Sequence, residues 1–304
     1  MKIIKASIAL IITIIFAAVA FVLISIQMFD PNKEPKNYGK LDSQLFAKQE
    51  SIQPLLVYFG GSEGGNSMTK KHNVSERKLY TDNGYAMLAI GYFGMEGLPA
   101  ELDRISLDAI YEEIKKTQKN PNIDATCVAV IGGSKGAELA LALASKYSDI
   151  NAAISLAGPH VSFNSIYYAS NGRTGSFSFK NESLPYATVP ISAIPHLLVG
   201  DFRKAHELAL EDHEAVAKAT IMVENINGPI LLISGEKDQV WPSAEMSAEV
   251  MKRLKEKRFK HRYHHIMVPN GDHFQPQSDY HSQVIEFLNN NFKPMCNSSG
   301  ATST

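Results

Sequence analysis

Three polar side chains that could act together in nucleophilic chemistry each follow an apolar stretch of the chain. Ser134 lies in a G-x-S-x-G pattern over 132–136, after the run "TCVAVI". Asp238 follows "PILLISG" and His273 follows "IMVPNGD". In this chain order a carboxylate can orient an imidazole, and the imidazole can take the proton of a serine hydroxyl. We therefore interpret Ser134 as a nucleophile, His273 as its base and Asp238 as the acid.

The residues around the serine fit a sharp turn between a strand and a helix. Gly132 and Gly136 give the room that such a turn needs to push the hydroxyl out at the edge of a sheet. The Lys135 N–H, at the start of the predicted helix, could stabilise an oxyanion. A second N–H donor is expected in the loop "FGGSEGG", where glycines allow close approach of the backbone. Ser62 is the favoured donor and Glu63 the second choice, although the loop could also be an ordinary glycine-rich turn.

Two other acidic residues compete for the role of the acid. Glu236 could orient the imidazole instead, which would leave Asp238 as a turn residue. Asp272 adjoins His273 in sequence, but we expect its side chain to point elsewhere. The serine motif alone is a weak signal, and the predicted strand before it and helix after it strengthen the interpretation.

A group of histidines near the end of the chain resembles a metal site at first sight. His261, His264 and His265 lie in or next to the predicted strand "RYHHIMVP". Neighbouring residues of a strand point to opposite faces of the sheet, so these side chains are not expected to converge. We predict no metal site and no cofactor.

The elements that must position these residues alternate between apolar strands and amphipathic helices. Continuous apolar strands separated by helices indicate a mostly parallel sheet covered on both faces. Together with the serine turn, this predicts an α/β-hydrolase fold. The segment 159–227 breaks the alternation and is expected to form a cap insertion over the catalytic edge. Strands are expected at 54–61, 85–93, 126–133, 152–158, 229–235 and 262–269, and helices at 100–118, 135–147, 202–219, 243–257 and 279–292.

The N-terminus carries a hydrophobic segment that could cross a membrane. A basic tail, 1–5, precedes the uncharged residues 6–29. At about 1.5 Å per residue such a helix is long enough for a hydrocarbon core of about 30 Å. We predict a transmembrane signal-anchor, with a signal peptide cleaved after the small-x-small pattern at 18–20 as the alternative. A linker is expected at 30–51, a catalytic domain at 52–293 and a flexible tail at 294–304.

Charge near this helix bears on which side of the membrane holds the body. Lys2 and Lys5 favour a tail on the cytoplasmic side, which predicts an extracytoplasmic body on a single-pass anchor. Lys33, Lys36 and Lys40 follow the span and weaken the asymmetry.

The two cysteines do not fix the compartment. Cys127 lies in an apolar strand and Cys296 in a polar tail far along the chain, so a disulfide is not expected.

Overall composition argues against a nucleic-acid partner. The chain has 30 basic and 31 acidic residues, so it presents no net positive field to a phosphate backbone. The hydrophobic content of 44% is that of a globular protein. The expected partners are a small acyl substrate and, through the N-terminal helix, a membrane.

Four motifs in order resemble the C-terminal catalytic domain of acyl-CoA thioesterases and bile acid-CoA:amino acid N-acyltransferases. They are "GYFGMEGLPAELDRISLDAI", "VAVIGGSKGAELALALAS", "GPILLISGEKDQVWPS" and "VPNGDHFQPQ", within a similarity over 52–292. The resemblance implies an α/β-hydrolase whose nucleophile, acid and base are Ser134, Asp238 and His273. A serine nucleophile resembles the thioesterase branch, since the transferase branch uses cysteine. The membrane helix, and the absence of a β-sandwich between it and the catalytic domain, depart from the family's eukaryotic members.

The expected activity is cleavage of an acyl thioester through an acyl-enzyme intermediate. A carboxylesterase or lipase acting on membrane or envelope esters would use the same residues, and acyl transfer to an amine is a further alternative. An inactive hydrolase fold that serves as a membrane-tethered binding module is the alternative without catalysis.

Overall fold

The structure, a computed structural model, describes residues 2–49 and 51–298. Its body is built on a seven-stranded sheet in the order β1-β3-β2-β5-β6-β9-β10. All neighbouring strands of this sheet are parallel except β1, which pairs antiparallel with β3. The strands are β1 (Asp42–Phe46), β2 (Gln53–Phe59), β3 (Ala86–Gly91), β5 (Ile123–Gly133), β6 (Ala152–Leu156), β9 (Ile230–Gly235) and β10 (Tyr263–Val268).

Helices cover both faces of the sheet, as the apolar strands require. In β2, Leu55, Val57 and Phe59 face one apolar cluster, and Leu56 and Tyr58 face the other. The first cluster is closed by α3 (Leu107–Thr117), α4 (Lys135–Lys146) and α8 (Ser243–Glu256). The second is closed by α2 (Val74–Asp82), α10 (His281–Phe287) and α11 (Lys293–Ser298). A sheet buried on both faces explains why its strands are continuously apolar.

Part of the predicted linker over 30–51 belongs to the sheet. The segment Asp42–Phe46 forms β1 and pairs with β3, from Asp42 opposite Gly91 to Phe46 opposite Met87. Phe46 packs against the core and carries the Arg77 guanidinium on its ring, at 4.1 Å from the centroid. The strand therefore pairs the backbone groups of β3 and itself becomes the edge of the sheet.

The prediction that the cysteines are unpaired is wrong. Cys127 of β5 and Cys296 of α11 form a disulfide, although 169 residues separate them in sequence. The prediction of a flexible tail over 294–304 is also wrong as far as Ser298. These residues belong to α11, which packs on the sheet. The remainder of that tail, 299–304, lies outside the described residues.

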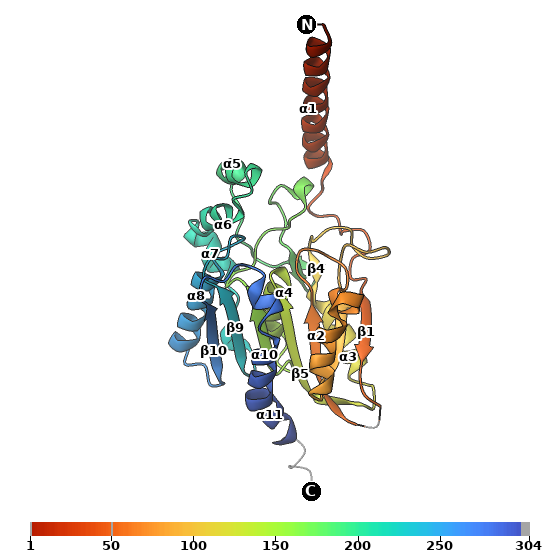
Figure 1. Cartoon of the computed structure of the whole chain (residues 1–304), viewed down its shortest axis with the longest axis vertical. Helices are drawn as coiled ribbons and strands as arrows, with labels where there is room; N and C mark the ends of the chain where they lie inside the picture. The colour runs from red at the N-terminus through yellow and green to blue at the C-terminus, as the bar shows by residue number, and fades with distance from the viewer. Residues whose placement is uncertain (1, 50, 299–304) are drawn as a thin grey trace.

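The insertion between β6 and β9 forms a cap on the carboxyl side of the sheet (Figure 1). A small sheet joins β4 (Ile105–Ser106), β7 (Phe177–Phe179) and β8 (Glu182–Ser183). The helix predicted over 202–219 is two helices, because Asp201 and Asp212 each accept a backbone N–H at a helix start. The cap helices are α5 (Ile194–Leu198), α6 (Phe202–Leu210) and α7 (His213–Ala219).

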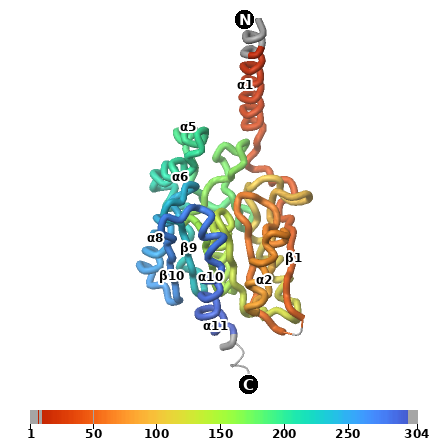
Figure 2. The backbone as a smooth tube through the Cα atoms, viewed as in Figure 1, coloured from red at the N-terminus to blue at the C-terminus, as the bar shows by residue number. Residues whose placement is uncertain are grey.

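The N-terminal helix α1 (Lys2–Met28) stands away from the body (Figures 1 and 2). Its stretch Leu10–Met28 is long and apolar enough to cross a membrane, and none of it is buried against the body. A signal sequence has the same properties, so length and composition alone fit both a span and a signal.

Candidate active site

Ser134 lies at the turn between β5 and α4, in a backbone conformation that non-glycine residues rarely adopt. Its φ is 54° and its ψ is −120°. Such strain persists only where the surrounding structure holds it, and it is common at functional sites. Here the Ser134 N–H donates to the Leu156 carbonyl of β6 at 2.9 Å. The serine is largely buried.

The glycines of the turn leave no room for side chains. A Cβ on Gly132 would lie 2.1 Å from the Gly136 carbonyl oxygen. A Cβ on Gly136 would lie 2.4 Å from the carbonyl oxygen of Gly60, in the loop after β2. Strand, helix and loop therefore approach one another as closely as the backbone permits, and they hold the serine between them.

Asp238 and His273 form a buried pair on the loops that follow β9 and β10. Asp238 Oδ2 lies 2.8 Å from His273 Nδ1, and both side chains are buried. The other carboxylate oxygen of Asp238 accepts the backbone N–H groups of Val240 and Trp241 at 2.8 and 3.2 Å. The pair with Nδ1 leaves Nε2 of His273 as the nitrogen available to a nucleophile.

The two competing acids lie elsewhere. Glu236 is exposed and accepts the Asn270 N–H through Oε2, at 2.7 Å. Asp272 accepts the N–H groups of Phe274 and Gln275 at 2.8 and 2.9 Å, which caps the turn after the histidine. Of the three candidates, Asp238 is the one in contact with His273.

Gln277, for which the sequence pattern gives no signal, connects the histidine segment to the serine turn. Its amide nitrogen donates to the His273 carbonyl at 2.8 Å. Its amide oxygen lies 2.2 Å from where a Cβ on Gly133, the residue before Ser134, would be. Residues from the loops after β5, β9 and β10 are thus gathered at one edge of the sheet, where parallel strands end together.

The loop after β2 reaches the same edge. A Cβ on Gly61 would lie 3.1 Å from Ser134 Cβ, so the backbone of this loop passes directly beside the serine. Ser62 and Glu63 are exposed, and the Glu63 carboxylate turns back to accept the Gly61 N–H at 3.1 Å. Lys135 begins α4, where N–H groups have no partner within the helix.

A buried ion pair lies directly behind the serine turn. Lys135 Nζ donates to Glu138 Oε2 at 2.8 Å and to Ser176 Oγ at 2.7 Å. Glu138 also accepts the Phe163 N–H at 3.1 Å, which joins α4 to the cap. Burial lowers the pKa of the Lys135 ammonium and raises the pKa of Glu138, while their mutual attraction opposes both shifts. Lys135 and Glu138 are three residues apart on a predicted helix, and this spacing indicates that they can pair. The spacing does not indicate that the cap buries the pair.

Trp241, from the loop after β9, and residues of the cap surround Asp238 and His273. Trp241 stacks on Phe163 at 5.9 Å and meets the His273 ring edge-on at 5.7 Å. Arg203 of α6 donates to the Asp238 carbonyl at 2.9 Å. Burial lowers the pKa of His206, beside Trp241, to about 4, so its imidazole is neutral at neutral pH.

The histidines first considered for a metal lie apart from this edge. His265 Nε2 lies 2.7 Å from Ser234 Oγ, and the His261 ring packs on Phe259 at 5.3 Å. Within 2–49 and 51–298 no three side chains of metal-ligating type come together.

Comparison with known families gives one match, and the matched residues include Ser134, Asp238 and His273. The family model described as BAAT / Acyl-CoA thioester hydrolase C terminal matches residues 106–289, more than half of the chain.

Curated relatives agree with this match. Acyl-coenzyme A thioesterase 1 of Mus musculus is 26% identical over 221 residues, which are 72% of this chain and 48% of the relative. Acyl-coenzyme A thioesterase 2, mitochondrial, of Homo sapiens is 28% identical over 225 residues, which are 73% and 43% of the two chains. The chain thus spans about half the length of the curated relatives it matches.

Solved structures of low sequence identity share the fold. A Mycobacterium tuberculosis puromycin-hydrolyzing peptidase superposes with a TM-score of 0.57 at 16% identity, over 83% of this chain and 37% of that one. The α/β hydrolase GrgF from Penicillium sp. sh18 superposes with a TM-score of 0.53 at 14% identity, over 84% and 99% of the two chains. The body is therefore an α/β-hydrolase fold, as the alternation of strands and helices predicts.

Proposed function

Because this chain belongs to the family described as BAAT / Acyl-CoA thioester hydrolase C terminal, we propose that it is a serine hydrolase that cleaves acyl thioesters. The observation that carries the proposal is the buried contact of Asp238 with His273 at the sheet edge where Ser134 is held in a strained turn. Each member of this set has the chemistry that its role requires.

In the proposed reaction the Ser134 hydroxyl attacks the acyl carbonyl while His273 Nε2 takes its proton. Asp238 fixes the tautomer and stabilises the imidazolium that forms. Backbone N–H groups of Lys135 and of the loop at Ser62 stabilise the oxyanion, with Gly61 placing that loop beside the serine. His273 then donates this proton to the sulfur or oxygen of the leaving group as the bond to the acyl carbon breaks, so that a thiol or alcohol departs and the acyl-enzyme remains. Water activated by His273 then releases the acid and restores Ser134.

The proposed location of the reaction is the outer side of a membrane. We propose that α1 is a single-pass anchor with the short basic tail inside, which leaves the body extracytoplasmic. The disulfide between Cys127 and Cys296 supports this side, because disulfides persist in oxidising compartments and are rare in the cytosol.

This location favours a second candidate for the leaving group. Coenzyme A esters are intracellular metabolites, whereas an anchored body outside the cytoplasm meets esters of the membrane or envelope. The same residues would cleave such an ester as a carboxylesterase or lipase. Transfer of the acyl group to an amine would differ only in the second step, where an amine replaces water.

Labelling with a fluorophosphonate probe tests the nucleophile. The full chain is expected to be labelled, and Ser134→Ala to lose both labelling and at least about 10³-fold of its turnover. Ser51→Ala, an exposed serine outside the site, serves as the control and should remain labelled. A full chain that stays unlabelled beside a labelled control hydrolase would indicate an inactive fold that serves as a binding module.

Substrate comparison separates the candidates for the leaving group. Hydrolysis of palmitoyl-CoA is measured against p-nitrophenyl esters of the same acyl chain, with and without an added amine. A preference for the thioester supports the first proposal, and a preference for the oxygen ester supports the second. An amide product that forms faster than the free acid would indicate acyl transfer.

A further inference from the structure

The tip of the cap exposes a concentration of apolar side chains. We call the segment 191–202, which includes α5, the cap tip. Ile191, Leu198 and Val199 are 76%, 81% and 80% exposed, and no residue of α5 is buried. Apolar patches of this kind on a soluble body mark sites of contact with a partner. The exposed large apolar residues of the cap tip are Ile191, Ile194, Leu197, Leu198, Val199 and Phe202.

The cap tip lies on the side of the body from which α1 departs. Figure 1 shows α5 at the end of the body from which α1 departs, whereas α11 lies at the opposite end. A membrane crossed by α1 would therefore lie against the cap tip.

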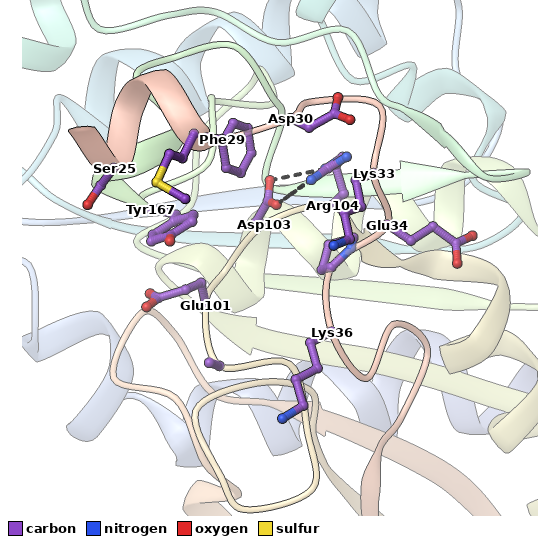
Figure 3. Close-up of a pocket in the computed structure, with 13 residues that line it drawn as sticks. Ser25, Phe29, Asp30, Lys33, Glu34, Lys36, Glu101, Asp103, Arg104 and Tyr167 are labelled. Carbon is purple, nitrogen blue, oxygen red and sulfur yellow. Dashed lines mark hydrogen bonds and ion pairs between the residues drawn. The ribbon is translucent and has the colours of Figure 1, made fainter. Parts of the chain in front are cut away.

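The junction between α1 and the body fixes this arrangement. Phe29 directly follows α1. The guanidinium groups of Arg104 and Arg173 lie 5.6 and 5.2 Å from the centre of its ring. Its ring also meets Tyr167 edge-on at 5.7 Å. Arg104 pairs with Asp103 at 2.8 Å, and these side chains line a cavity of about 550 Å³ at the foot of the helix (Figure 3). The helix is thus held by cation–π and aromatic contacts rather than by a loose tether.

A second contact between α1 and the body lies further toward the N-terminus of the helix. The Tyr168 ring lies 6.5 Å from the ring of Phe21. Phe21 belongs to the apolar stretch Leu10–Met28, about 10 Å before its end at 1.5 Å per residue. Tyrosine is enriched at the membrane interface, where its ring is apolar and its hydroxyl is hydrated. With α1 in a bilayer, the loop that carries Tyr168 reaches the interface.

We propose that the cap tip inserts into the membrane interface and forms a second membrane contact beside α1. The occupant of this apolar surface is the lipid bilayer, into which its side chains enter to a depth of about 5–10 Å. The inference rests on the proposal that α1 is an anchor. It extends that proposal, because α6 continues from the cap tip to Arg203, which holds the Asp238 carbonyl at 2.9 Å. The membrane contact and the acid loop are therefore joined through one helix.

Lipid-dependent quenching of a fluorophore tests the insertion. Variants of the full chain with one added cysteine each, Leu198→Cys, Leu23→Cys and Ile52→Cys, are labelled with an environment-sensitive dye and reconstituted into phosphatidylcholine vesicles. The native cysteines are joined to each other and buried, so they do not compete for the label. Ile52 is the matched control, since it is 73% exposed and directly precedes β2, at the amino end of the parallel strands and thus opposite the edge that carries the cap. Doxyl-labelled phosphatidylcholine then supplies the quencher.

The expected result is quenching and a blue shift at positions 198 and 23, with neither change at position 52. A label at 198 that behaves like the label at 52, while the label at 23 is quenched, would overturn the inference and leave the anchor standing. Absence of quenching at 23 would contradict the anchor itself. A blue shift at 198 without lipid quenching would point to a protein partner or a second copy, and would also overturn the proposal.

Discussion

Two acidic residues two positions apart in the loop after β9, Asp238 and Glu236, differ in burial and contacts, and this difference supports Asp238 as the proposed acid. Asp238 is buried, contacts His273 and accepts two backbone N–H groups, whereas Glu236 faces solvent. The sequence favours Asp238 but is compatible with either residue, because a turn can present either side chain.

Asp238→Asn is therefore expected to lower kcat by about 10³–10⁴-fold, because an amide does not hold the imidazole in the required tautomer. Glu236→Gln is the matched control and should leave kcat within a few-fold of the original. Steady-state kinetics on a p-nitrophenyl ester gives both values. A larger loss in the Glu236 variant would transfer the role of the acid to that residue.

The buried pair of Lys135 and Glu138 makes a prediction about stability at the same scale. Glu138→Leu leaves the Lys135 ammonium buried without its partner, so the free energy of unfolding should fall by about 3–5 kcal/mol. The double variant Lys135→Met with Glu138→Leu removes both charges and should recover much of that loss. Urea denaturation compares the three proteins. Equal losses in the single and double variants would show that the pair contributes through contacts other than charge.

At the scale of elements, the disulfide joins the last described helix to the strand that carries the serine. Cys127 lies in β5, which ends at the turn of Ser134, and Cys296 lies in α11. The helix is therefore held against the sheet independently of its apolar contacts.

Replacing both cysteines, by Cys127→Ala with Cys296→Ala, should lower the free energy of unfolding by about 2–5 kcal/mol, because the closed loop is long. Denaturation with and without a reductant measures this effect. The reductant should destabilise the original protein and leave the double variant unchanged. A double variant as stable as the original would mean that α11 needs no covalent link.

The elements that sequence reasoning identified are those whose pattern depends on local burial. The apolar strands, the glycine turn at Ser134 and the acid and base loops all follow from periodicity and turn chemistry. β1 was missed because an edge strand needs only Leu45 and Phe46 to be apolar. The split of 202–219 into α6 and α7 depends on Asp201 and Asp212, whose capping bonds compete with continuation of the helix.

The cysteine pair was missed for a different reason. Its partners are brought together by the packing of α11 on β5, which no local pattern encodes. The same holds for Gln277 and Arg203, whose contacts with the site depend on the tertiary arrangement of the loops and the cap.

At the scale of the whole molecule, the body is expected outside the cytoplasm. Protease added to sealed cells should then degrade the body without permeabilisation, and a cytosolic marker protein should remain intact. Immunoblotting against the body reports the outcome. Degradation only after permeabilisation would place the body inside, and would make acyl-CoA the leading substrate.

The cation–π contacts of Arg104 and Arg173 with Phe29 have a consequence for the kinetics of an anchored chain. A long flexible tether lets a domain sample a large volume, and the effective concentration of its target falls as the tether lengthens. Here the contact begins one residue after α1 ends, so in a chain anchored as proposed the edge that carries Ser134 would stay at a fixed height above the lipid. The search of such an anchored enzyme for a membrane-borne acyl chain would be two-dimensional, and its turnover would depend on the number of substrate molecules per area of bilayer rather than on their concentration in bulk water.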